Sequence, residues 1–360
     1  MHPTAGAIET DNAPRLEMAR YLHGTSCVPL FVRGDAVGIL SGLDAESIDF
    51  CMTSPPYWAQ RSYHAGGIGG EGTPDEFIQE LLRVFQEVHR VLKRSGSFWL
   101  NLGDTYHEKR LLGIPWRTAF ALTDRQGWVL RNSVIWHKVK GGLDGTKDRL
   151  RNVHENVFHF VKSPRDYFYD ADAIRRTSRK ARIVNGSVVS ATGVSGVRYR
   201  RQIELAPLLS DGEKRLALDA LESVLQEVRD EKISDFRMVI RGQQRTTHSD
   251  SASVSGRARE IEQKGFYFLR YHPGGSKPSD VWDILPEDTQ KRDAHFAPYP
   301  EDLCKIPILS TCPVGGTVLD PFCGTGTTML AAYRLGRKSI GIDLSRQYVE
   351  NARERCNFLL

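Results

Sequence analysis

The sequence lacks several features that define whole classes of protein. No apolar run approaches the roughly 18–20 residues that a membrane span requires, so no membrane partner is expected. Residues 1–20 include acidic side chains where a secretion signal would have an apolar core. None of the six cysteines belongs to a C-x-x-C pair, so neither a zinc site nor a redox motif is indicated and no metal is expected. The cysteines fit reduced thiols, which predicts a cytoplasmic protein.

Charge and composition are those of an ordinary globular protein. The 360 residues are 40% hydrophobic and 26% charged, and the formal net charge is +5. This length is enough for one large domain or two modest ones with a core of normal size. The mild excess of positive charge permits a polyanionic partner without establishing one.

Strand-like and helix-like patterns alternate in two separate parts of the chain. Expected strands cover residues 47–52, 97–102, 128–136, 156–161, 317–320 and 339–343, and expected helices cover residues 74–93, 115–126, 301–311, 327–335 and 347–356. Such alternation predicts an α/β fold with a mostly parallel twisted sheet and helices on both faces. The predicted organisation is a flexible leader (1–27), a first α/β half (28–162), a region of different texture (163–277) and a second α/β half (278–360).

The region 163–277 is irregular and rich in positive charge. One amphipathic helix is expected at 211–231, with Leu216, Leu221, Val224, Leu225 and Val228 on its apolar face. The region also contains a basic cluster, formed by Arg175, Arg176, Arg179, Lys180, Arg182, Arg198, Arg200 and Arg201. A cluster of this kind fits either a nucleic-acid surface or a solvated loop.

A glycine-rich turn follows the expected strand at 317–320. Its sequence, Asp320-Pro-Phe-Cys-Gly-Thr-Gly326, leads into a helix, and Asp343 ends the next strand. Glycines let the backbone approach a ligand closely, and an acid at the end of the following strand can accept hydrogen bonds from ribose hydroxyls. The pattern therefore favours a nucleoside-type cofactor. A P-loop is disfavoured because no Lys-Ser/Thr pair follows, a dinucleotide stays possible, and Asp320 would repel a pyrophosphate but can hold an amino group.

A second motif, Thr53-Ser-Pro-Pro-Tyr-Trp58, follows the strand at 47–52. Its two prolines fix φ and remove two amide donors, which leaves a rigid loop rich in acceptors. Carbonyl oxygens and the Ser54 hydroxyl can accept hydrogen bonds from an amino group, and Tyr57 and Trp58 offer faces for stacking. The loop suits an extruded nucleobase, although a turn that caps the sheet is an alternative. Cys51 and Cys323, beside the two motifs, are expected to be small buried fillers.

Together these motifs resemble those of the DNA amino-methyltransferases, the N4-cytosine/N6-adenine family. Their order is that of its beta group, in which the catalytic half precedes the cofactor half. The resemblance covers nearly all of 28–162 and 279–358. Further matching stretches lie at 33–35, 90–93, 98–104, 135–138, 155–163 and 295–300. The resemblance implies a Rossmann-like methyltransferase fold that uses S-adenosylmethionine, with 163–277 as an inserted target-recognition region.

Roles for individual residues follow from the same resemblance. The target base would be held by Ser54, Pro55, Pro56 and Tyr57. The cofactor would contact Asp35, Thr53, Phe296, Pro298, Asp320, Phe322, Gly324, Thr325, Gly326, Thr327, Thr328 and Asp343. The phosphates and base edges of double-stranded DNA would be contacted by Arg175, Arg176, Arg179, Lys180, Arg198, Arg200 and Arg201. A cognate restriction endonuclease and a prokaryotic or phage source are implied too, while the oligomeric state and the DNA site stay open.

The expected chemistry is direct methyl transfer to an exocyclic amine. Hydrogen bonds from the amine to Ser54 and the Pro55 carbonyl would turn the nitrogen lone pair toward the methyl group. The loop contains no cysteine nucleophile for attack at carbon. Because cytosine enzymes of the family mostly have Ser at the first loop position and adenine enzymes mostly have Asp, Ser54 favours cytosine N4. The alternatives are N6-adenine methylation, an RNA substrate, and a DNA-binding protein with an inactive methyltransferase fold.

Overall fold

The computed structural model describes residues 13–59, 67–140, 145–176, 180–242, 256–287 and 299–357. The chain forms two units, one of Met1–Ala173 with Ser279–Leu360 and the other of Ile174–Pro278. The second unit begins later than the boundary expected at residue 163. Residues 163–173 stay with the first unit because their backbone binds to it: Phe168 N donates to Ser95 O (2.9 Å) and Asp170 N donates to Ser310 O (2.7 Å).

An eight-stranded sheet forms the centre of the first unit, in the order β1-β14-β13-β2-β3-β7-β6-β12. Its strands are β1 (Leu30–Arg33), β2 (Ile48–Thr53), β3 (Leu92–Leu102), β6 (Val129–His137), β7 (His154–Val161), β12 (Val281–Asp283), β13 (Thr317–Asp320) and β14 (Lys338–Asp343). β7 is antiparallel to β3 and β6, and the other neighbouring pairs are parallel. The predicted α/β fold with a mostly parallel sheet is confirmed.

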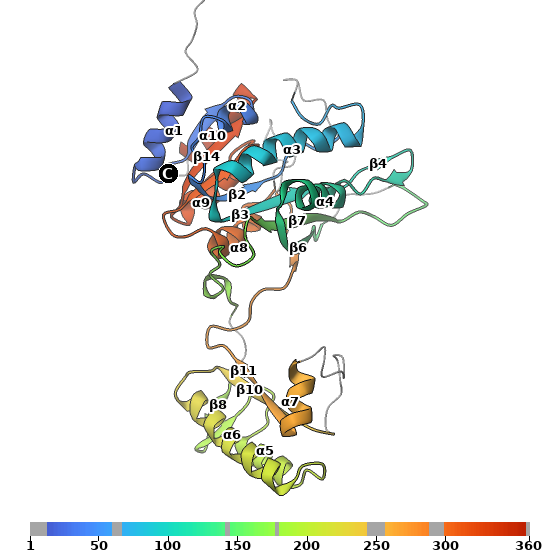
Figure 1. Cartoon of the computed structure of the whole chain (residues 1–360), viewed down its shortest axis with the longest axis vertical. Coiled ribbons are helices and arrows are strands. Elements are labelled where there is room, and N and C mark those ends of the chain that lie inside the picture. Colours follow the sequence, from blue (N-terminus) through green and yellow to red (C-terminus); the bar gives the residue numbers. More distant parts are fainter. Residues whose placement is uncertain are drawn as a thin grey trace, which may run out of the picture. The chain divides into compact units, whose positions relative to one another are not determined.

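Helices cover both faces of this sheet (Figure 1). They are α1 (Ala13–His23), α2 (Ala36–Leu40), α3 (Pro74–Val91), α4 (Ile114–Gln126), α8 (Glu301–Thr311), α9 (Thr327–Arg334) and α10 (Arg346–Asn357). A short hairpin of β4 (Tyr106–His107) and β5 (Arg110–Leu111) lies between β3 and α4, and a 3-10 turn spans Asp172–Ile174. No helix in the described ranges is both long and apolar enough to cross a membrane.

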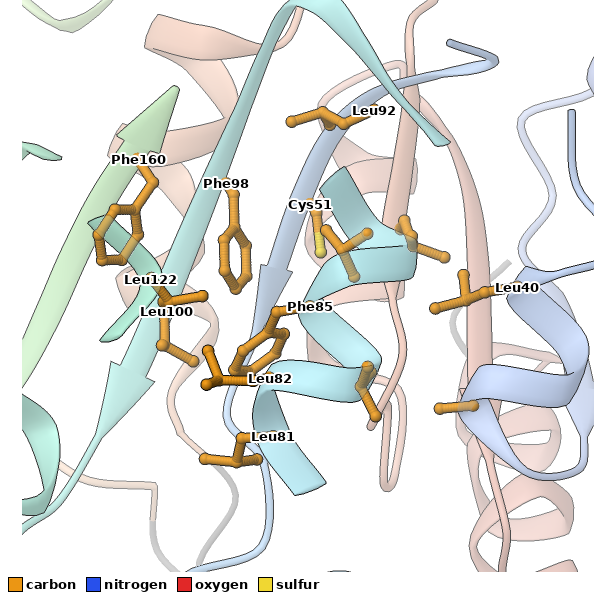
Figure 2. Packing of buried hydrophobic residues seen from close by; sticks show 14 of the residues in the cluster. Leu40, Cys51, Leu81, Leu82, Phe85, Leu92, Phe98, Leu100, Leu122 and Phe160 are labelled. Carbon is orange, nitrogen blue, oxygen red and sulfur yellow. The ribbon is translucent and has the colours of Figure 1, made fainter. Parts of the chain in front are cut away.

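Two hydrophobic clusters lie on the two faces of the sheet because successive residues of a strand point to opposite sides. Cys51 and Phe98 belong to the cluster that includes α2, α3 and α4. Their neighbours Phe50 and Trp99 belong to the cluster that includes α8, α9 and α10. Figure 2 shows Cys51 and Phe98 on the side of α3, together with Phe85 of that helix. Cys51 is fully buried, which confirms its role as a small filler.

The sequence around α3 explains why the helix forms there. Thr73 and Glu76 form a capping box, in which each side chain accepts a hydrogen bond from the other residue's backbone, and Pro74 fits the first turn. Phe77, Leu81 and their helical neighbours turn one face toward the sheet. Loss of such a cap typically costs about 1 kcal/mol, whereas the buried face supplies most of the stability of the helix.

Most of the described part of the expected leader is helical. Residues 13–23 form α1, and Met18 in its middle is only 1% exposed. Tyr21 Oη accepts a hydrogen bond from Ser339 N (2.8 Å), and Lys338 Nζ donates to Leu22 O (2.7 Å). These contacts attach α1 beside β14, so the prediction of a flexible leader is corrected for these residues.

The second unit has a core of its own. It contains β8 (Arg182–Val184), β9 (Ser187–Val189), α5 (Gly196–Glu204), α6 (Asp211–Arg229), β10 (Asp235–Ile240), α7 (Gly256–Lys264) and β11 (Phe266–Tyr271). These elements bury Tyr199, Leu221 and Phe236 in one cluster, so the region is more regular than its sequence suggests. α6 lies where a helix was expected, but Leu216 is 61% exposed. Ala217, one turn before Leu221, takes the buried position instead, because helical neighbours on one face are three or four residues apart.

Candidate active site

Both motifs lie at one edge of the central sheet. β2 ends at Thr53 and β13 ends at Asp320, and the two strands are parallel neighbours. The loop 54–58 and the turn 321–326 therefore begin side by side, although the chain separates them by more than half its length. Ligands of parallel α/β sheets bind at this carboxyl edge. β7 is antiparallel, so its first residues lie at the same edge as the last residues of its neighbours β3 and β6.

Asp320 connects the two motifs. Its carboxylate is 1% exposed and accepts hydrogen bonds from Thr53 Oγ1 (2.6 Å) and Phe322 N (3.1 Å) at one oxygen. The other oxygen accepts from Thr328 Oγ1 (2.6 Å) and Tyr299 Oη (3.2 Å). All four donors belong to the protein. Asp320 therefore organises the turn from inside, and its expected direct contact with a cofactor amino group stays a prediction.

Burial also changes the acidity of Asp320. Removal of the carboxylate from water raises its pKa from 3.8 to about 6, against the hydrogen bonds from Thr328 and Thr53, which lower it. The neighbouring Tyr299 also has a raised pKa. Burial and the charge of Asp320 raise the pKa of its phenol well above the usual value. The turn thus contains a carboxylate whose charge changes in the mildly acidic range.

The glycine turn and Asp343 fit a nucleoside ligand. Asp343 Oδ2 accepts from Gly324 N (3.0 Å) and Oδ1 accepts from Ser345 N (2.8 Å), so the carboxylate is fixed at the end of β14 but remains partly exposed. Burial raises its pKa. Gly326 has φ +76°, and a Cβ there would lie 3.0 Å from the ring of Phe31. The backbone can follow this course only with glycine, and one lone pair on each Asp343 oxygen remains for ribose hydroxyls.

The other expected cofactor residues differ in accessibility. Phe322 and Gly324 are partly exposed at the surface of the turn, whereas Thr325, Thr327 and Thr328 are buried. Thr327 Oγ1 accepts from Arg355 Nη1 (2.8 Å). The three threonines therefore stabilise the turn from its buried side. Cys323 is buried, as its expected role as a filler requires.

Thr53 and Asp35 lie beside the turn in different ways. Thr53 is fully buried and reaches the cofactor region only through its bond to Asp320. Asp35 is exposed and follows β1, whose last residue pairs with Asp343. Its carboxylate caps α2 by accepting from Gly38 N (2.9 Å). Phe296 and Pro298 lie outside the described residues.

The loop after β2 is held by polar contacts at both ends. Ser54 Oγ lies 3.3 Å from Tyr57 Oη and accepts a hydrogen bond from Asn101 Nδ2 (3.2 Å). Pro55 is buried and Pro56 is partly exposed. Trp58 is 6% exposed, and its Nε1 donates to Glu71 O (2.9 Å). Trp58 is therefore a packed anchor, and the stacking surface expected of the loop rests on Tyr57.

Three polar residues that sequence reasoning left without a role complete this site. Asn101 is on β3, Lys138 follows β6, and Glu155 is near the start of β7. Glu155 accepts from Tyr57 Oη (2.6 Å) and Asn101 Nδ2 (2.7 Å), and its other oxygen accepts from Lys138 Nζ. All three belong to stretches that matched the resemblance. Asn101 and Lys138 are polar residues where apolar strands end, which is a signal that could have selected them, whereas Glu155 is at the start of its strand and reaches this edge only because β7 is antiparallel.

Tyr57 is held in one orientation. Its hydroxyl is fixed by Glu155, and a Cβ at position 103 would lie 2.7 Å from Tyr57 Cε2, so only glycine leaves room for the ring. Burial and the charge of Glu155 raise the pKa of the Tyr57 phenol well above its usual value. The ring is thus neutral and fixed beside the serine. Such an arrangement can hold a planar, uncharged ligand next to Ser54.

The predicted basic cluster divides into two groups within the second unit. Arg198, Arg200 and Arg201 are exposed on α5, and Arg200 forms an ion pair with Glu222 of α6. Arg175 and Arg176 lie at the start of the unit; Arg175 Nη1 donates to Gly275 O (3.0 Å), and the backbone of Arg176 pairs with Ser276. Lys180 and Arg182 are exposed. Arg179 lies outside the described residues, and no metal-binding group of three or more His, Cys, Asp or Glu occurs within the described ranges.

Comparisons with known proteins agree with this geometry of a nucleoside-binding α/β enzyme. A family model described as DNA methylase, for N6 and N4 enzymes, matches residues 48–354. The chain is 30% identical over 374 residues to the type II methyltransferase M.SfiI of Streptomyces fimbriatus, covering 88% of each protein. It is 28% identical to the type II methyltransferase M.SmaI of Serratia marcescens, over 89% of this chain and 88% of that protein.

A solved structure supports the fold independently. The PvuII DNA methyltransferase (cytosine-N4-specific) matches with a TM-score of 0.53 at 17% identity, over 91% of this chain and 90% of that one. The chain belongs to the N6/N4 DNA methylase family and is a DNA methyltransferase.

Proposed function

We propose that this DNA methyltransferase transfers the methyl group of S-adenosylmethionine to the exocyclic N4 of a cytosine extruded from double-stranded DNA. The observation that carries the proposal is the bond between Thr53 and Asp320, which fixes the Ser54 loop against the glycine turn. An acceptor for an amino group thus lies next to a site that fits a nucleoside. Proximity and orientation of this kind supply much of the acceleration of a bimolecular transfer.

The residues of the turn would hold the cofactor by its different parts. Asp343 would accept hydrogen bonds from the ribose hydroxyls, Phe322 and the backbone of Gly324 would contact the methionine portion, and Asp35 would lie on the adenine side. When bound, S-adenosylmethionine supplies an electrophilic methyl group on a sulfonium. Asp320, with its four internal donors, keeps the turn in one shape and would place negative charge on the methionine side of the bound cofactor.

The Ser54 loop prepares the acceptor amine. The lone pair of an exocyclic amine is delocalised into the ring, which makes the nitrogen a poor nucleophile. Hydrogen bonds from the amine to Ser54 Oγ and the Pro55 carbonyl turn that lone pair toward the methyl group. The fixed ring of Tyr57 stacks on the base and holds its plane, in the way that flipped bases are held between apolar surfaces.

Cytosine is proposed over adenine because of Ser54. The family's cytosine enzymes mostly have Ser at this position, whereas its adenine enzymes mostly have Asp. The exposed arginines of α5 would contact DNA phosphates, and Arg175, Arg176 and Lys180 would form a second group of contacts. Since the named relatives are type II methyltransferases, we infer further that methylation protects DNA from an endonuclease of matching specificity.

Analysis of nucleosides tests the proposal. The protein is incubated with S-adenosylmethionine and mixed-sequence DNA, and the DNA is digested and examined by mass spectrometry. N4-methylcytosine is the expected product. N6-methyladenine would contradict the assignment of the base, and cofactor binding without any methylated base would indicate a DNA-binding protein with an inactive site.

A further inference from the structure

Glu155 lies at the inner end of a chain of hydrogen bonds that starts at Ser54. Its carboxylate belongs to a residue only 8% exposed and receives three donors: Tyr57 Oη, Asn101 Nδ2 and Lys138 Nζ. Ser54 Oγ is 3.3 Å from Tyr57 Oη, which in turn is 2.6 Å from Glu155 Oε2. Two hydroxyl groups therefore join the loop that receives the amine to a buried carboxylate.

Methyl transfer to an amine creates a proton that has to leave. The nitrogen uses its lone pair to form the N–C bond and becomes positively charged, and the N–H bond then breaks so that its electron pair returns to nitrogen. We propose that Glu155 is the acceptor of this proton, which reaches it through the hydroxyls of Ser54 and Tyr57. This inference rests on the proposed methylation of an amino group but not on which base carries it.

The transfer balances without any further reactant. The amine proton goes to Ser54 Oγ while the hydroxyl proton of Ser54 goes to Tyr57 Oη and that of Tyr57 goes to Glu155 Oε2. Both hydroxyls are neutral before and after the step, and Glu155 ends as the carboxylic acid. The positive charge on the methylated nitrogen is neutralised, and the negative charge of Glu155 disappears with it.

The neighbours of Glu155 define the route that the proton can follow. The Asn101 amide faces Ser54, Tyr57 and Glu155 through its Nδ2 donor, so it orients the three groups but accepts no proton from them. The raised pKa of Tyr57 prevents a phenolate from persisting, so the phenol passes a proton on. Lys138 balances the buried carboxylate, and its side chain, 31% exposed, connects this end of the chain to solvent.

Glu155→Gln is the first test, because glutamine keeps the shape and accepts a hydrogen bond from Tyr57 but binds no proton. With saturating cofactor and DNA, the single-turnover rate of methylation should fall about 100-fold or more. Cofactor and DNA affinities should stay within about twofold. The remaining rate should rise with pH, since hydroxide then removes the proton. A rate within twofold of the wild type would overturn the proposal.

Tyr57→Phe is the second test, because it interrupts the chain and leaves Glu155 with Asn101 and Lys138. The double variant should be no slower than the slower single variant, since both changes remove one route. Additive losses would overturn the proposal. If Glu155→Gln folds poorly, Tyr57→Phe alone still tests the route, and a rate for Tyr57→Phe within twofold of the wild type would overturn the proposal. Glu80→Gln, on the solvent-facing side of α3, is the matched control and should behave as the wild type.

The identity of the wild-type product distinguishes a failure of this proposal from a failure of the proposed function. If the wild type makes N6-methyladenine, the assignment of cytosine fails, whereas the ratio of variant to wild-type rates still reports on Glu155. If the wild type makes N4-methylcytosine and Glu155→Gln keeps its full rate and pH profile, the proton route fails alone.

Discussion

Thr53 Oγ1 donates a 2.6 Å hydrogen bond to Asp320 Oδ1, between two fully buried side chains that are 267 positions apart in the chain. Thr53 is the last residue of β2 and Asp320 is the last residue of β13. The bond joins the loop proposed to hold the base to the turn proposed to hold the cofactor. The geometry of methyl transfer therefore depends on two strand ends that the sheet places side by side.

Removal of this bond should affect stability and cofactor binding together. Thr53→Val preserves the shape of the side chain but leaves one oxygen of the buried Asp320 carboxylate without its hydroxyl donor. We expect a loss of about 1–3 kcal/mol in the free energy of unfolding and weaker binding of S-adenosylmethionine. Chemical denaturation and calorimetry measure the two effects. Thr53→Ser, which keeps the hydroxyl, is the control, and equal behaviour of the Val and Ser variants would contradict the account.

Asp320 should make stability depend on pH in a direction opposite to most carboxylates. Its pKa is raised by burial to about 6, above its value in the unfolded chain, so the folded protein binds the proton more tightly. Stability from this group is present below about pH 4 and is lost as the pH rises through 6. The loss amounts to about 3 kcal/mol.

Asp320→Asn isolates that contribution. The free energy of unfolding of the variant, relative to the wild type, should rise between pH 4 and pH 7.5, because asparagine has no charge to bury. Denaturation curves measured at several pH values give the difference directly. A difference that does not change with pH would mean that the carboxylate titrates normally in the folded protein.

The parts of the site that are local in sequence could be predicted, and those that depend on strand pairing could not. The glycine turn, Asp343 and the loop after β2 each follow directly from an apolar strand, so pattern and turn chemistry were sufficient. Glu155 joins the site because β7 runs antiparallel to β3 and β6. The direction of a strand depends on pairing with distant segments, and no local pattern encodes it.

The differences in the fold have the same origin. α1 has a short apolar face, and its place beside β14 is fixed by contacts of Tyr21 and Lys338 made only in the folded chain. In α6 the expected apolar face is correct at Leu221, Val224 and Leu225, which are buried, and wrong only at Leu216, which is 61% exposed. Ala217 takes the buried position in that turn, although residue type alone favours Leu216.

The arginines of α5 should contribute charge to DNA binding without regard to sequence. Each phosphate contact releases counterions, so Arg201→Ala should reduce the slope of log affinity against log salt by about 1. The measurement is a DNA titration at several salt concentrations. Arg83→Ala, on the exposed side of α3, is the control. An unchanged slope for Arg201→Ala would mean that this arginine makes no phosphate contact.

The most direct test of the account is a comparison of two quantities for Ser54→Ala: the single-turnover rate of methyl transfer to DNA and the dissociation constant of S-adenosylmethionine. Ser54 Oγ forms hydrogen bonds with Tyr57 and Asn101 and, among the described residues, with none of the glycine turn. The account predicts a rate at least about 100-fold lower, with the dissociation constant within about twofold of the wild type. Equal losses in both quantities, or an unchanged rate, would contradict the claim that Ser54 prepares the amine.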